Sequence, residues 1–278
     1  PTGYLTVNFN DKLDRIELND TSAETRLKTV SMDWASTDFS LNASGTVNVT
    51  GTSFKAADGL LSISAERFVG TFNTQVAELS LQARDAGTSS DLVVNELDSL
   101  RLVSDRWSQG GLVTASGRLA VTLASAESTL TLASGRISAG MGGEIRLVAD
   151  DIDFATGRDK VSGTGLLSIT VRTAGQDIRV GGAAQSLFGN DQSQAGPTGF
   201  MALAMQDLDA LADGFSEIRI GEGATQSTMV LGDAEDVTIG GTNFSAQFTD
   251  RLTLIADEIV VAGDVRSTTQ ISTQSRLL

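Results

Sequence analysis

The 278-residue chain contains no cysteine and no histidine. Without cysteine it forms no disulfide, no thiolate metal site and no cysteine nucleophile. Without histidine it lacks the Ser-His-Asp triad, the commonest general base and the usual zinc and iron ligands. These two absences exclude more chemistry than any other feature of the composition.

Basic residues are also scarce. The chain has 20 Lys and Arg against 35 Asp and Glu, for a net charge of −15. A nucleic-acid-binding protein needs a basic surface that displaces counterions from phosphates, and so does a protein that binds an anionic membrane. The composition therefore argues against both partners. The acidic excess predicts either a solvated surface or affinity for divalent cations.

Proline occurs only at Pro1 and Pro197, and no apolar run approaches the ~18 residues of a membrane span. A residue without an N–H fits poorly into a chain that is strand almost everywhere. No signal peptide is recognisable, the chain starts at Pro1, and its last residues still have a strand pattern. We therefore expect a processed product or a fragment of a longer chain.

What the sequence has instead is a repeated phrase, apolar–x–apolar–x–small–polar–polar–apolar. A repeat of this kind decides the architecture before any single motif does. Looser copies begin at Leu79, Leu130 and Leu167. The four clearest copies are Leu61–Phe68, Leu100–Trp107, Ile145–Ile152 and Leu252–Ile259.

The phrase predicts an all-β fold. Alternating apolar and polar residues indicate a half-buried strand, the small residue suits a corner, and the two polar residues face water there. Copies recur about every 20 residues, which fits one coil of a parallel β-solenoid. An antiparallel β-sandwich array is the alternative, although Asn-Gly and Asp-Gly hairpin signals are scarce.

One segment interrupts the repeat. Residues 186–200 are polar, rich in glycine and include Pro197, so we expect a loop, and Gln206–Ala212 predicts one or two helical turns. The loop is either an excursion or a boundary between two blocks, and either solvated or a binding loop. The organisation expected is a solenoid block at 1–185, an excursion at 186–213 and a second solenoid block at 214–278.

Two stretches resemble a known family. Leu252–Ile259 resembles the repeat unit of filamentous-haemagglutinin-like bacterial exoproteins, and Leu208–Gly221 resembles a segment of very large repeat-rich surface proteins of Gram-negative bacteria. The resemblance implies a right-handed parallel β-helix that is secreted and lies outside the cell or on its surface. It implies adhesion or filament formation and brings no catalytic residues.

Acidic clusters at predicted corners are candidate calcium ligands, because calcium prefers carboxylate and carbonyl oxygens. Asp151 and Asp153 point to the same side of a strand. Asp233, Glu235 and Asp236 form the second cluster. The alternative is that both corners are only solvated. Calcium is thus a possible cofactor, and no other is indicated.

Carbohydrate cleavage is the other chemistry that this architecture can host, since glycosidases use two carboxylates. A polyuronate substrate also needs a basic, aromatic-lined groove, yet aromatic residues make up only 5% of the chain. Arg67, Arg106 and Arg136 recur at corners, either as a ladder or in exposed ion pairs. Phe68 and Trp107 are interpreted as packing residues.

The function expected is therefore structural or adhesive, without enzymatic activity. Stacked coils would form a stiff rod within a large secreted surface protein. Its partners would be neighbouring copies or further repeats of the same chain, stacked end to end, and cell-surface carbohydrate is a further candidate partner. The alternatives are a polysaccharide lyase or glycosidase and a calcium-dependent carbohydrate-binding module.

Overall fold

A computed structural model describes eleven ranges of the chain: 4–9, 15–32, 38–87, 89–105, 110–154, 157–181, 200–222, 228–232, 246–261, 265–267 and 271–275. These ranges are mostly strand, with one short helix, α1 (Met205–Asp209). The strand pairs in them are parallel. The fold is all-β, and the antiparallel sandwich alternative is wrong.

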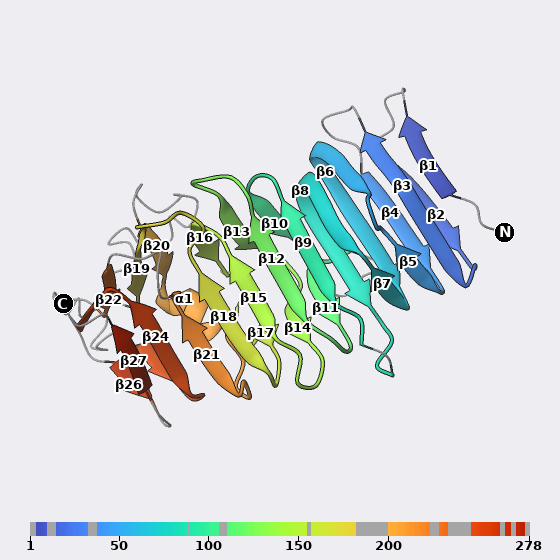
Figure 1. Ribbon diagram of the computed structural model, residues 1–278. Coiled ribbons are helices and arrows are strands. Elements are labelled where there is room, and N and C mark those ends of the chain that lie inside the picture. Colours follow the sequence, from blue (N-terminus) through green and yellow to red (C-terminus); the bar gives the residue numbers. More distant parts are fainter. Residues whose placement is uncertain are drawn as a thin grey trace.

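Parallel pairing arranges the strands in ladders, in which each strand is hydrogen-bonded to the strands beside it. Figure 1 shows the ladders extending in one direction, from blue β1 to red β27. The first ladder, which follows that whole direction, includes the strands β1 (Tyr4–Phe9), β3 (Glu24–Met32), β5 (Thr46–Asn48), β7 (Arg67–Val69), β9 (Leu92–Glu96), β12 (Leu119–Leu123), β15 (Ile145–Val148), β18 (Leu166–Thr170), β21 (Glu217–Ile220), β24 (Leu252–Ala256) and β27 (Ile271–Ser275).

A second ladder begins beside the first and then divides. Its first strands are β2 (Arg15–Asp20), β4 (Asp38–Ala43), β6 (Ser53–Ala65) and β8 (Thr71–Ala83). The long strands β6 and β8 belong to both ladders, because their first halves also pair with β3 and β9. After β8 one branch contains β10 (Leu100–Leu102), β13 (Thr129–Leu132) and β16 (Asp151–Asp153), and the other contains β11 (Leu112–Thr114), β14 (Ile137–Ala139) and β17 (Val161–Ser162).

The interrupted region forms a separate four-stranded sheet. Its strands in spatial order are β20 (Phe200–Leu203), β19 (Asp177–Val180), β22 (Thr228–Leu231) and β25 (Glu258–Val261). Strand β20 also lies beside β16, so it is inserted between β16 and β19 although it follows β19 in sequence. A two-stranded sheet contains β23 (Ala246–Phe248) and β26 (Val265–Ser267).

This arrangement refines the expected excursion. Residues 186–199 lie outside the described ranges. The predicted helical turns occur as α1, and no described helix is long and apolar enough to span a membrane. The rest of the segment returns to the stack, because β20 pairs with β19 and Leu211 forms a parallel bridge with Val161.

Alternation along each strand places the large apolar side chains in one continuous core. In β12, for example, Leu119, Val121 and Leu123 are buried while the residues between them are half-buried. Phe68 is a core residue as predicted, and its ring packs edge-on against Phe72 at 5.1 Å between centroids. Each such fully buried side chain contributes roughly 1.5–3 kcal/mol through apolar burial.

The repeated phrase behaves as predicted at the corners of the first and fourth copies. In the first copy Ala65 is buried, and Glu66 and Arg67 are exposed before the chain turns inward again at Phe68. The third copy differs, because Asp150 is buried although the pattern predicts a solvated residue. The reason is a set of hydrogen bonds that is described below.

Glycines form a stack of their own at one corner. A Cβ on Gly143 would lie less than 3.0 Å from the carbonyl oxygen of Gly117, and a Cβ on Gly165 would lie equally close to that of Gly143. Real Cβ atoms do not approach backbone this closely, so side chains would push the layers apart. The corner therefore needs glycine because neighbouring layers touch there.

We predict that Gly165→Ala destabilises the protein by about 3 kcal/mol or more, because overpacking a tight contact costs about 1–3 kcal/mol and backbone has no room to relax. The measurement is urea unfolding followed by circular dichroism. Gly87→Ala is the control, since its Cβ would approach only the Asp85 carboxylate, at 3.3 Å. Equal losses in both variants would contradict the stacking argument.

Candidate functional site

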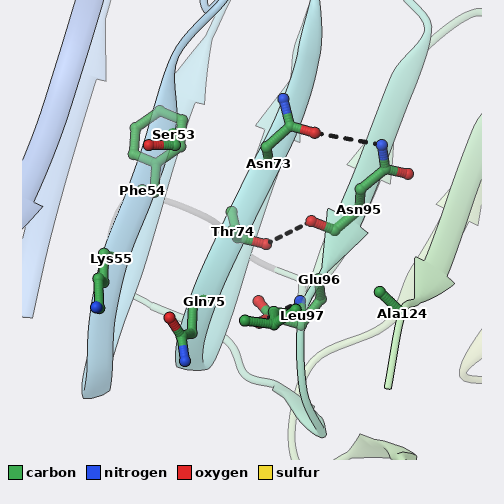
Figure 2. Close-up of a pocket in the computed structure, with 10 residues that line it drawn as sticks. All are labelled: Ser53, Phe54, Lys55, Asn73, Thr74, Gln75, Asn95, Glu96, Leu97 and Ala124. Carbon is green, nitrogen blue, oxygen red and sulfur yellow. Dashed lines mark hydrogen bonds between the residues drawn. The ribbon is translucent and has the colours of Figure 1, made fainter. Parts of the chain in front are cut away.

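A shallow hollow of about 320 Å³ lies over β6, β8 and β9. Figure 2 shows its polar side chains in rows that cross the three strands. One row follows the register Ser53, Asn73 and Asn95, and the Asn95 amide Nδ2 donates to Asn73 Oδ1 at 3.3 Å. The remaining lining residues are Phe54, Lys55, Thr74, Gln75, Glu96, Leu97 and Ala124.

Glu96 forms the buried wall of this hollow. It occupies an inward position of β9, paired with Thr74 on one side and with Leu123 on the other. Its Oε1 accepts the Leu97 N–H at 2.8 Å, and both oxygens lie 3.3 Å from the Val76 N. Burial raises the pKa of the Glu96 carboxyl, and these hydrogen bonds oppose the rise. Glu96 thus joins β9 to β8 and is closed to solvent.

Asp150 is a second buried carboxylate, and it connects three layers. Its Oδ1 accepts the N–H groups of Arg172 and Thr173 at 3.1 and 2.7 Å. Its Oδ2 accepts the Thr173 hydroxyl and the Glu127 N–H, both at 2.7 Å. Glu127 has a left-handed φ of 59°, so the carboxylate holds a turn that non-glycine residues seldom adopt. These four bonds explain why Asp150 is buried.

Asp207 on α1 is the third buried carboxylate. It accepts the Phe154 N–H at 2.6 Å and the Ala204 N–H at 2.8 Å, so it ties α1 to the residue that follows β16. Burial raises the pKa of Asp207 to about 7; the two hydrogen bonds oppose the rise, and the charges of Asp153 and Asp151 add to it. Its hydrogen bonds make it a structural cap of α1.

The structure places only part of the predicted calcium site. Asp151 and Asp153 lie on β16, are half-buried and share one side of the strand, as predicted. Asp151 Oδ1 accepts the Ala202 N–H of β20 at 3.3 Å. Asp233, Glu235 and Asp236 lie outside the described ranges. Within those ranges no group of three or more acidic residues has an arrangement that would hold a metal ion.

The predicted arginine ladder is also only partly described. Arg106 and Trp107 lie outside the described ranges. Arg67 lies on β7, where its Nε donates to Thr46 Oγ1 at 2.7 Å, whereas Arg136 precedes β14 in another ladder. The two described arginines are therefore not stacked on one another.

Exposed ion pairs do occur between neighbouring strands. Arg101 of β10 is in register with Glu78 of β8, with 3.4 Å between Arg101 Nε and Glu78 Oε1. Solvent screens such exposed pairs, and each contributes about 0–1 kcal/mol. This pair involves Arg101, which is not a corner arginine, and it defines no site, so an ion-pair role of the corner arginines stays a prediction.

The sequence interpretation missed the three buried carboxylates. A signal for Glu96 was present, because Leu92, Val94 and Glu96 form one alternating face and the third position should be apolar. No comparable signal marks Asp150 or Asp207, whose burial depends on backbone groups from neighbouring layers.

The fold and these sites define an all-β protein of parallel strands, with carboxylates buried on strand β9, between β15 and β16, and on α1. No family model, curated protein or solved structure matches the chain.

We predict that Asp150→Ala lowers the free energy of unfolding by about 2–4 kcal/mol, because it leaves several N–H groups without an acceptor. The measurement is urea unfolding at pH 7. Asp58→Ala is the matched control, since Asp58 is exposed on β6. If both variants are equally stable, the hydrogen bonds to Asp150 do not hold the layers together.

We predict that Asp207 makes stability depend on pH. Its folded pKa of about 7 lies above the ordinary value of 3.8, so the folded chain binds a proton more tightly. The favourable contribution is complete below about pH 4 and is lost as the pH rises through 7. The free energy of unfolding, measured between pH 4 and 8, should fall less with rising pH in the Asp207→Asn variant than in the native chain.

Asp209→Asn is the control for this titration, because Asp209 is exposed on the same helix. It should keep the native pH dependence. If the free energy of unfolding of Asp207→Asn falls with pH as much as that of the native chain, Asp207 is not the group that titrates.

Proposed function

We propose that this chain is a structural and adhesive segment of a large secreted bacterial surface protein. In this proposal its strands follow a right-handed parallel β-helix with about 20 residues per coil, and stacked coils form a stiff rod. Residues 1–185 and 214–278 are the two blocks of coils, and residues 186–213 are the excursion between them. The proposed location is outside the cell or on the surface of a Gram-negative bacterium.

One observation carries the proposal: equivalent positions of successive strands hold equivalent side chains. In the first ladder, Ile145, Leu167, Ile218 and Leu252 are in register and are at most 3% exposed. Such a stack has a repeating backbone interface and a continuous core, which are the properties that a stiff rod requires.

The spacing of the hydrogen bonds supports a coil of the proposed length. Side chains that bond across adjacent strands are 23 residues apart for Asn19 and Asn42 and 22 residues apart for Asn73 and Asn95. The Val76 N–H and its acceptor Glu96 are 20 residues apart. Longer intervals also occur: 30 residues between Ser104 and Ser134, 36 between Gly214 and Asp250, and 51 between Asp177 and Thr228, where the chain includes the excursion.

Uncovered core positions support stacking at the end of the array. Ile271 of β27 is 39% exposed, whereas Leu252, its partner in β24, is fully buried. Val261 of β25 is 65% exposed, whereas its partner Leu231 is 3% exposed. We propose that a neighbouring copy or a further repeat of the same chain covers these residues.

The carbohydrate-cleaving alternative has less support. The two acids with raised pKa values, Glu96 and Asp207, are buried, and their oxygens accept backbone N–H groups. Their environment is explained by the structure that they hold, without a substrate. The proposed role is therefore mechanical. Among the described residues, no acidic cluster is arranged to bind calcium.

Small-angle scattering and negative-stain electron microscopy test the rod. We expect an elongated particle. Its length should equal the number of stacked strand layers multiplied by about 4.8 Å. A compact, nearly spherical particle would contradict the proposal. The same measurement on the Gly165→Ala variant should give a shorter ordered length.

Substitutions at the uncovered residues test stacking between copies. We expect the native chain to associate as its concentration rises in sedimentation experiments, because association buries Val261 and Ile271. Val261→Asp and Ile271→Asp should prevent it by placing a charge in the contact. Val69→Asp is the control, since Val69 is also exposed but lies on β7. A native chain that stays monomeric contradicts stacking between copies.

A further inference from the structure

The hollow over β6, β8 and β9 presents polar groups that the fold leaves unused. The bond between Asn95 Nδ2 and Asn73 Oδ1 leaves the Asn73 amide NH₂ and the Asn95 amide oxygen facing solvent. Gln75 donates through Nε2 to Asp98 at 3.1 Å, which leaves its amide oxygen free. Asn73 and Gln75 lie on β8 and Asn95 lies on the adjacent strand β9, so one donor and two acceptors face solvent on neighbouring strands about 4.8 Å apart.

The hollow also has an apolar part. Leu97 is 47% exposed, an unusual value for a leucine in this structure, and Ala124 lies beside it in Figure 2. Lys55 and the buried Glu96 line the hollow, and Asp98 is one hydrogen bond away from it. The surface therefore combines amide donors and acceptors with an aliphatic patch.

A neutral saccharide has the complementary chemistry. Its hydroxyl groups both donate and accept hydrogen bonds, and the C–H face of its ring is apolar. At about 320 Å³ the hollow lies at the lower limit of ligand-site volumes, so it would hold one or two sugar units.

We propose that this hollow binds neutral oligosaccharides. The inference goes beyond the proposed rod and does not depend on it, because all the lining residues belong to one stretch of a single chain. No exposed aromatic ring lines the hollow, so we expect a Kd of about 1 mM for one site.

Saturation-transfer NMR on the full chain tests the proposal with three probes: cellotetraose, chitotetraose and trigalacturonate. We expect transfer to at least one of the two neutral probes. Transfer to the anionic trigalacturonate alone would overturn the proposal, because it would indicate binding by charge. Absence of transfer to all three probes at millimolar concentration would also overturn it.

Matched variants locate the binding. Asn73→Ala combined with Asn95→Ala should reduce transfer at least threefold, and Gln75→Ala should reduce it as well. Asn19→Ala is the control, because Asn19 is also exposed and hydrogen-bonded to an asparagine of the next strand but does not line this hollow. Circular dichroism checks that each variant is folded. Equal transfer in the double variant and the control would overturn the assignment to the hollow, whatever the particle shape.

Discussion

The structure depends on one constraint: parallel strands in register place each residue about 4.8 Å from its equivalent in the next layer. A buried apolar residue therefore lies on another buried apolar residue, as Leu167 lies on Ile145. The same constraint acts at corners, where Gly143 and Gly165 leave no room for a Cβ. The repeated phrase in the sequence is the consequence of this stacking, since each layer must fit its neighbours.

Buried carboxylates meet a second need of this architecture. A chain that turns after every short strand leaves N–H groups at its turns without a partner in the ladder. Asp150 and Asp207 accept such groups from the layers beside them, and Glu96 accepts the Val76 N–H of the neighbouring strand β8. Because the acceptor and the donors come from different layers, each carboxylate also fixes the layers relative to one another. Burial in this role raises the pKa of Glu96 and of Asp207.

The stack has consequences for function as well. Equivalent residues form continuous rows on the outside, so polar groups such as Asn73 and Asn95 become an extended surface instead of a deep pocket. A surface of this kind suits weak, repeated contacts along the proposed rod.

The sequence by itself determined the class of structure. Alternation, small corner residues and recurrence every ~20 residues predicted strands, corners and parallel stacking, because these features follow from local geometry and repetition. It also predicted that Asp151 and Asp153 share one side of a strand. Only the tertiary structure decided the insertion of β20 between β16 and β19, the division of the second ladder after β8, and the burial of Asp150, Asp207 and Glu96. The reason is physical: those features depend on contacts between residues 20 or more positions apart, and no local pattern records which backbone group a carboxylate will meet.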